Sequence, residues 1–415
     1  MNLETFFNTS QEKRFFYPGA ILLSRDSADR VIQILRQNRG DGLVLLFYDK
    51  VFAGSDYLAK FKSEASLDIR LIELEGFPTS ENAAKHVDLF KEHKIDSVVS
   101  IGGGSVADFA KAVKTGLEFG YFSSLGLTKA YDENGSTKTH VETEPSKKAS
   151  IQYIAVPTTC GSGAEASRIY VTYRNVTKVK DFGRTWSCVA NYTVVDGTFI
   201  ENLPRKALII CAFDAFLHLF ESFVIKNERS HFNDMVTTYH LPILMNSLAR
   251  ILKRVGTEED YDNLAMASTM GGVAISNVRT GNIHEAAGGL FELVPLSHGE
   301  ALFVFFEEAI AMYRNLIQDR EALLSYSLAG KIELNDLRSV ESLVAWWNDV
   351  FESEGITEDI RNAISALDQE VASNYIYERV QNDNVWNTKE CPILMTSEMN
   401  KELISTSLRK FARTG

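Results

Sequence analysis

The sequence lacks the features that mark several protein classes. No apolar run approaches the roughly 18–20 residues of a transmembrane helix, and the N-terminus has no signal-peptide layout. The four cysteines are scattered without a C-x-x-C pair, as is typical of reduced thiols in a cytosolic protein. The formal net charge of −12 argues against nucleic acid as a partner. We therefore expect a cytoplasmic protein that binds neither membranes nor nucleic acid.

The chain also has no internal repeats and no low-complexity segments. A length of 415 residues typically corresponds to about two or three domains, each with its own core. The continuous apolar run at 43–48 is typical of a buried strand, further strands are predicted at 69–74, 98–101 and 151–156, and helical patterns lie at 27–36 and 81–93. Their alternation predicts parallel β-α-β units.

The pattern changes after about residue 203. Long helical patterns follow, such as 206–224 and 231–255, and no strong strand signal appears beyond them. We therefore predict an α/β dinucleotide-binding domain with a parallel sheet over residues 1–200. An all-α metal-binding domain would follow over residues 201–415.

Four residues of the second half form a candidate metal-binding set. Asp214 and His218 are four positions apart, so on a helix they share one face. His284 and His298 are fourteen positions apart and must come from separate elements, or from a long helix and the loop after it. One carboxylate and three imidazoles suit Fe²⁺ or Zn²⁺ better than Mg²⁺ or Ca²⁺. The spacing alone leaves open an Asp–His pair with unrelated structural histidines.

A glycine turn in the first half is a candidate phosphate site. Residues 97–111 predict a buried strand, a turn at 102–105 and the start of a helix. Glycines allow close backbone approach, and the free N–H groups of a helix N-terminus attract phosphate. The turn is not a G-x-G-x-x-G motif, because no third glycine follows Ser105. By itself it is equally compatible with a tight strand–helix connection.

Four segments together resemble the iron-containing (group III) alcohol dehydrogenases, relatives of glycerol dehydrogenase and dehydroquinate synthase. They are GGGSVADFAKAV (102–113), VPTTCGSGAEAS (156–167), FDAFLHLFES (213–222), and NVRTGNIHEAAGGL (277–290) with LSHGEAL (296–302). Their order and separations also match, so the resemblance spans most of the chain. It implies a dehydroquinate synthase-like fold with the active site in the cleft between an NAD-binding domain and a helical metal domain.

The resemblance also implies roles for individual residues. The implied ligands of a catalytic Fe²⁺ or Zn²⁺, which would act as a Lewis acid on the alcohol or aldehyde oxygen, are Asp214, His218, His284 and His298. The implied NAD contacts are Gly103, Gly104 and Ser105 at the pyrophosphate, and Thr158, Thr159 and Ser162 along the phosphate and nicotinamide side. Asp108 and Lys111 match a family Asp-x-x-Lys pair, with a capping charge and a surface lysine as the alternative.

Asp49 bears on the choice of nicotinamide cofactor. It directly follows the strand at 43–48, where a carboxylate can accept hydrogen bonds from the adenosine ribose and repel a 2′-phosphate. We therefore predict NAD(H) over NADP(H), with an ordinary turn aspartate as the alternative.

Three residues depart from the family pattern. Gly288 stands where family members commonly have a second histidine, and Glu285 replaces a small residue. Arg279, five positions before His284, could pair with a carboxylate or phosphonate of the substrate or form a surface salt bridge.

These features predict a homodimeric, metal-dependent and NAD(H)-linked alcohol dehydrogenase or aldehyde reductase. Its substrate would be small and could be anionic, as phosphonoacetaldehyde is. The alternative, which Gly288 favours, is a non-redox cyclase or lyase, or an inactive member of the same superfamily.

Overall fold

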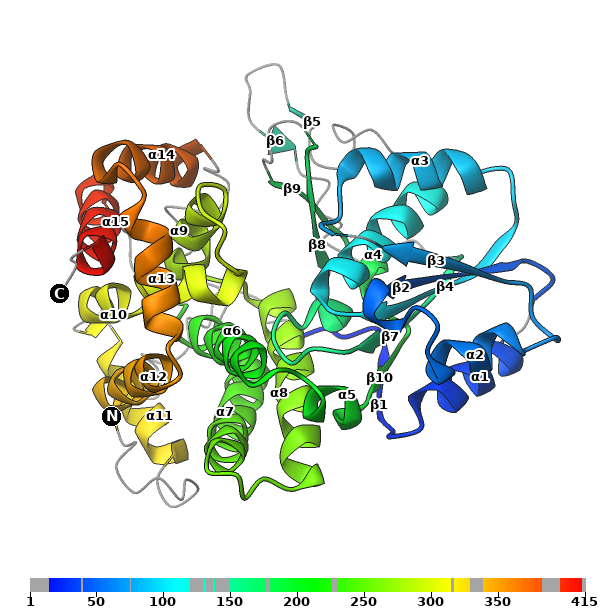
Figure 1. The fold of residues 1–415 in the computed structure, drawn as a ribbon, viewed down its shortest axis with the longest axis horizontal. Helices are drawn as coiled ribbons and strands as arrows, with labels where there is room; N and C mark the ends of the chain where they lie inside the picture. The colour runs from blue at the N-terminus through cyan, green and yellow to red at the C-terminus, as the bar shows by residue number, and fades with distance from the viewer. Residues whose placement is uncertain are drawn as a thin grey trace.

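The computed structural model describes residues 15–38, 40–74, 76–119, 130–131, 137–138, 150–175, 180–225, 230–314, 317–328, 339–382 and 396–412. In these residues an α/β half lies beside a helical half (Figure 1). This arrangement confirms the fold class predicted from the sequence.

A six-stranded parallel sheet forms the α/β half, with strand order β1-β10-β7-β4-β2-β3. The strands are β1 (Ala20–Leu23), β2 (Leu43–Asp49), β3 (Ile69–Leu74), β4 (Ile95–Gly102), β7 (Gln152–Pro157) and β10 (Tyr192–Val195). Alternate side chains of a strand point to opposite faces, and both faces are apolar. Val44 and Leu46 belong to one buried cluster, and Leu45 and Phe47 belong to another.

Helices cover both faces of the sheet, as the apolar strands require. The first cluster includes apolar residues of α1 (Ser27–Gln37) and α2 (Asp56–Lys62). The second includes apolar residues of α3 (Ser80–Phe90) and α4 (Gly104–Phe119). Figure 1 shows the two pairs on opposite sides of the sheet.

Short elements lie between and around the strands. The described 3₁₀ helices are η2 (Lys50–Phe52), η3 (Ala164–Ala166) and η4 (Trp186–Cys188). Two antiparallel pairs, β5 (Ala130–Tyr131) with β6 (Thr137–Lys138) and β8 (Ile169–Tyr173) with β9 (Lys180–Arg184), stand apart from the main sheet. Neither of these hairpins was predicted from the sequence.

The helical half is built around α6 (Arg205–Val224), which is buried almost throughout from Leu208 onward. The other helices are α5 (Gly197–Glu201), α7 (His231–Leu252), α8 (Glu258–Asn277), α9 (Asn282–Phe291), α10 (His298–Tyr313), α11 (Gln318–Leu328), α12 (Val340–Ser353), α13 (Ile356–Ser365), α14 (Gln369–Asn382) and α15 (Ser397–Ala412). One described helix, α6, is long and apolar enough to cross a membrane, but 83% of that stretch is buried inside the protein. We therefore interpret α6 as a helix of the protein core.

The segment that follows β7 connects the two halves. The backbone N–H of Arg168 donates to Ser276 Oγ at 3.0 Å, and Thr269 Oγ1 donates to Glu165 Oε1 at 2.7 Å. Gly163 and Gly272 approach so closely that a Cβ at residue 272 would lie 2.0 Å from the Gly163 carbonyl oxygen. These contacts fix α8 against the segment that follows β7, and residues of this segment and of the helices line a pocket.

Candidate active site

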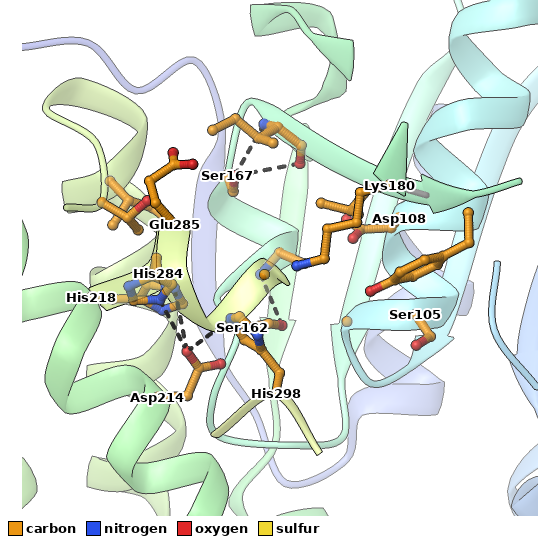
Figure 2. Close-up of a pocket in the computed structure, with 18 of the residues that line it drawn as sticks. Ser105, Asp108, Ser162, Ser167, Lys180, Asp214, His218, His284, Glu285 and His298 are labelled. Carbon is orange, nitrogen blue, oxygen red and sulfur yellow. Dashed lines mark hydrogen bonds and ion pairs between the residues drawn. The ribbon is translucent and has the colours of Figure 1, made fainter. Parts of the chain in front are cut away.

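The four predicted metal ligands meet at one point of the structure. Asp214 and His218 lie one turn apart on α6, whereas His284 is near the start of α9 and His298 is the first residue of α10. The Nε2 atoms of His218, His284 and His298 lie 3.5, 3.4 and 4.0 Å from Oδ1 of Asp214. Figure 2 shows the three imidazoles turned toward this carboxylate. Sequence segments 84 residues apart, from 214 to 298, are thereby brought to a single site.

Hydrogen bonds on the far side of two rings fix their orientation. His218 Nδ1 donates to the Gly161 carbonyl at 3.2 Å, and His284 Nδ1 donates to Glu221 Oε2 at 2.5 Å. Because the acceptors are a carbonyl and a carboxylate, both rings carry a proton on Nδ1, and Nε2 is the atom that a metal ion would bind. Glu221 is itself held by the backbone N–H groups of Gly281 and Ile283 at 2.8 and 3.0 Å. It was not singled out from the sequence, although it lies within the matching segment 213–222.

Charges in the cluster are strongly coupled. Burial raises the pKa of Asp214, but His218, His284 and His298 outweigh it and lower this pKa below its usual range. Burial lowers the pKa of His284, but Glu221 and Asp214 outweigh it and raise the pKa to about 9. Burial, supplemented by Lys180 and the other imidazoles, lowers the pKa of His298 to about 3. The site thus concentrates ionisable groups whose protonation states depend on one another.

The residues fit a divalent transition metal. Ligand atoms of Asp214, His284 and His298 all lie within 4.8 Å of one another. Asp214 Oδ1 and His284 Nε2 are buried and make no hydrogen bond to any described residue, which is costly unless another partner binds them. The donor set of imidazoles and one carboxylate suits Fe²⁺ or Zn²⁺. With the two outer hydrogen bonds in place, the cluster has the form of an oriented metal site.

A pocket of about 380 Å³ connects the ligand cluster to the glycine turn. Gly104 and Ser105, the first residues of α4, line the same pocket as the four ligands, and Ser162 also lines it. A Cβ at Gly104 would lie 2.7 Å from Ser162 Oγ, so only glycine fits there without a shift. The turn therefore presents the N-terminus of a 16-residue helix to the pocket. The free backbone N–H groups at a helix N-terminus can bind a phosphate group.

Other predicted site residues lie outside the described lining of this pocket. They are Gly103, Thr158, Thr159, Asp49 and Arg279. A Cβ at Gly103 would meet the Thr159 side chain at 3.2 Å, so these two residues pack together behind the turn. Asp49 ends β2, and its carboxylate accepts a hydrogen bond from Val51 N at 3.0 Å. The assignments of Gly103, Thr158, Thr159 and Asp49 to the cofactor, and of Arg279 to the substrate, stay predictions.

Arg279 differs from the other predicted residues in its backbone. It lies between α8 and α9 with φ of 138°, a conformation that side chains rarely adopt. Among the described residues that line the pocket, the lysine and arginine residues are Lys180 and Arg379. The anion-binding role predicted for Arg279 therefore gains no support from the pocket.

Lys111 is not a surface lysine. It is fully buried and donates to the carbonyls of Ser167 and Ile169 at 2.8 and 2.7 Å. Oδ1 of Asp108 lies 3.9 Å from Nζ of Lys111, and Asp108 lines the pocket. Burial raises the pKa of Asp108 to about 6. The pair thus positions the entry to β8 beside the pocket, and the alternative of a capping charge and a surface lysine is wrong for Lys111.

Comparison with protein families agrees with this geometry. The model of the iron-containing alcohol dehydrogenases matches residues 18–197, and the C-terminal model of the same family matches residues 208–389. The chain belongs to the iron-containing alcohol dehydrogenase family. The resemblance inferred from the motifs is thereby confirmed, and the predicted cofactors, NAD and iron, are those that the family uses.

Individual members of this family are distant from the chain in sequence. The 4-hydroxybutyrate dehydrogenase of Clostridium kluyveri is 24% identical over 326 residues, which cover 77% of this chain and 81% of that protein. The NAD-dependent methanol dehydrogenase of Bacillus methanolicus is 26% identical over 289 residues, 69% of this chain and 72% of its own. At this distance the relatives do not fix the substrate.

Solved structures share the fold over nearly the whole chain. The iron-containing alcohol dehydrogenase of Thermococcus thioreducens has a TM-score of 0.80 at 20% identity, covering 95% of this chain and 100% of its own. A sulfoacetaldehyde reductase from Bifidobacterium kashiwanohense, solved with NAD⁺, has a TM-score of 0.75 at 17% identity, covering 98% and 100%. The shared architecture places a parallel α/β half beside a helical half.

Proposed function

We propose that this family member is a metal-dependent, NAD(H)-linked alcohol dehydrogenase or aldehyde reductase that acts on a small anionic substrate. The observation that carries the proposal is one pocket lined both by the four ligands and by the N-terminus of α4. A hydride can pass between cofactor and substrate only if both bind in contact, and a single pocket with both kinds of site meets that need.

The residues have separate tasks in this reaction. Asp214, His218, His284 and His298 would hold the metal, which supplies a Lewis acid for the alcohol or aldehyde oxygen. Glu221 and the Gly161 carbonyl orient two of the rings. Gly104 and Ser105 would bind the cofactor phosphates through backbone N–H groups, and Asp49 would select NAD(H). The apolar hairpin residues Ile169 and Val171 line the same pocket and limit the access of water.

Two of the relatives are consistent with a small substrate that has an acidic end, whereas the names of others describe neutral alcohols such as methanol and butanol. The two are a 4-hydroxybutyrate dehydrogenase and a sulfoacetaldehyde reductase, and both names describe short molecules that carry an anionic group besides the reacting carbon. Phosphonoacetaldehyde has the same layout. We further propose, from the sequence alone, that the enzyme is a homodimer and that it acts in the cytoplasm.

The test is a screen of protein reconstituted with Fe²⁺ or with Zn²⁺. Oxidation of NADH would be followed with 4-oxobutanoate, sulfoacetaldehyde, phosphonoacetaldehyde and neutral aldehydes of similar size. The proposal expects turnover that needs the metal and is fastest with an anionic aldehyde. Tight NAD⁺ binding without turnover of any aldehyde or alcohol would instead favour the non-redox or inactive alternative, for which Gly288 is the main argument.

A further inference from the structure

Lys180 places a positive charge inside the pocket. It begins β9 and pairs with Tyr173 of β8 in the antiparallel register. Directly opposed residues of an antiparallel pair point to the same face, and Tyr173 and Lys180 both line the pocket. Figure 2 shows the Lys180 side chain extending into the pocket on the side of His298.

The ammonium group of Lys180 has a specific location. It lies 3.5 Å from the point that a Cβ on Gly288 would occupy, and among the described residues no other atom from outside the adjoining backbone of α9 lies within 4 Å of that point. The ring centroid of Phe291 is 5.6 Å away. The lysine therefore occupies the space that the missing side chain at residue 288 leaves beside the metal ligands. Gly289, in contrast, faces α14, where a Cβ would meet Ile376 at 3.2 Å.

The backbone of Lys180 is anchored while its ammonium group is not. Its N–H donates to Glu292 Oε1 at 3.4 Å, and Glu292 also accepts hydrogen bonds from Tyr375 at 2.7 Å and from Arg379 at 2.8 Å. No described residue forms a hydrogen bond or ion pair with Lys180 Nζ in the structure. Lys180 is half-buried, and an ammonium group withdrawn from water is costly unless an anion pairs with it, so the pocket favours a ligand that brings one.

We propose that Lys180 binds the anionic group of the aldehyde substrate and so selects acidic aldehydes. This inference rests on the proposed function. The carbonyl end would lie at the four ligands, and the carboxylate, sulfonate or phosphonate end would lie against Lys180 in the space above Gly288. The cofactor diphosphate would instead lie at Gly104 and Ser105, which also line the pocket.

The carboxylates around Lys180 leave room for such a ligand. Glu292 is neutralised by Arg379, and Asp214 belongs to the metal set. Glu285 lines the pocket as well and adds negative charge near Lys180. Burial is the main cause that lowers the pKa of Lys180, and Glu292, Glu285 and Asp214 act against it. An aldehyde with a positive end is therefore the competing ligand that the experiment must include.

The experiment compares wild type with Lys180→Met, which keeps the length of the side chain, and Lys180→Arg, which keeps the charge. Lys94→Met, at an exposed lysine before β4, is the matched control. Initial rates are measured with NADH and with 4-oxobutanoate, pentanal or 4-aminobutanal. We expect Lys180→Met to raise KM for 4-oxobutanoate roughly tenfold or more, as loss of a charged contact does. KM for pentanal should change little, and Lys180→Arg should restore most of the affinity.

A binding measurement separates this inference from the proposed function. Calorimetry in the presence of NADH, where an alcohol cannot react, would compare 4-hydroxybutyrate with 1,4-butanediol. Wild type should bind the acid more tightly than the diol, and Lys180→Met should remove that difference even if no aldehyde is turned over. Three results would each overturn the inference. They are an equal rise of KM for 4-oxobutanoate and for pentanal in Lys180→Met, a rise of KM for NADH alone in that variant, and a preference of wild type for 4-aminobutanal.

Discussion

Glu221 of α6 accepts a hydrogen bond from the Nδ1 atom of His284 on α9 at 2.5 Å. The carboxylate is buried, and two backbone N–H groups hold it in place. It therefore fixes both the tautomer and the orientation of the imidazole whose Nε2 faces Asp214. About two turns of α6, from Asp214 to Glu221, thus carry two ligands and the residue that orients a third.

Glu221→Gln should weaken metal binding without unfolding the protein. The amide keeps the shape of the carboxylate but cannot polarise His284 as a carboxylate does, so metal affinity should fall by roughly 10- to 100-fold. The measurement is a competition titration against a chromophoric chelator, with the midpoint of thermal unfolding as a check on folding. Glu307→Gln, at a carboxylate that pairs with Lys410, is the control. An unchanged affinity would remove Glu221 from the site.

His284→Ala should lose bound metal and nearly all turnover, because it removes a ligand and leaves Asp214 and Glu221 without their shared partner. Metal content by mass spectrometry and the rate of NADH oxidation measure the two effects. His240→Ala is the matched control, because this histidine lies on α7 and its ring forms a hydrogen bond with the Val236 carbonyl of the same helix. Full metal occupancy in His284→Ala would mean that the ligand set is wrong.

Asp49 should give NADH an advantage over NADPH. Repulsion of the 2′-phosphate by the carboxylate should contribute on the order of 1–3 kcal/mol to the ratio of kcat/KM values. Asp49→Asn tests the charge alone, because an amide oxygen can still accept the hydrogen bond from Val51, whereas Asp49→Gly removes both. The ratio should fall toward one in both variants. Equal efficiency with the two cofactors in wild type would show that Asp49 does not face the ribose.

The fold was predictable where the hydrophobic pattern is long and regular. The sequence predicted strands at 43–48 and 69–74 and a helix at 206–224, and the structure has β2 at Leu43–Asp49, β3 at Ile69–Leu74 and α6 at Arg205–Val224. Strand β10 was missed because four residues give too short a run to show a period. The β8–β9 hairpin was missed for another reason. Lys180–Arg184 is mostly polar, and its pairing depends on a neighbour rather than on its own pattern.

Site residues were predictable from the sequence only where they belong to a motif of the family. The four ligands follow from matched segments, but Glu221 and Lys180 follow from contacts in space. Glu221 meets His284 63 residues later in the chain. Lys180 reaches Gly288 because the register of a hairpin and the start of α9 bring residues 108 positions apart together. The sequence shows that Gly288 stands where the family commonly has a histidine. Only the structure shows that Lys180 occupies the space which that histidine would take.

Gly288→His should lower activity rather than restore a missing group. A general acid typically contributes roughly 10²–10⁴-fold, so a site that simply lacked its acid should gain at least about tenfold from a new histidine. The structure argues otherwise, because a Cβ at residue 288 would lie 3.5 Å from Nζ of Lys180. Alanine fits at that distance, but an imidazole must displace the ammonium group. Gly288→Ala should therefore stay near wild type, while Gly288→His should lose turnover of acidic aldehydes. Single-turnover hydride transfer and pH–rate profiles of all three proteins measure this, and a gain of roughly tenfold in Gly288→His would point to a degraded dehydrogenase instead.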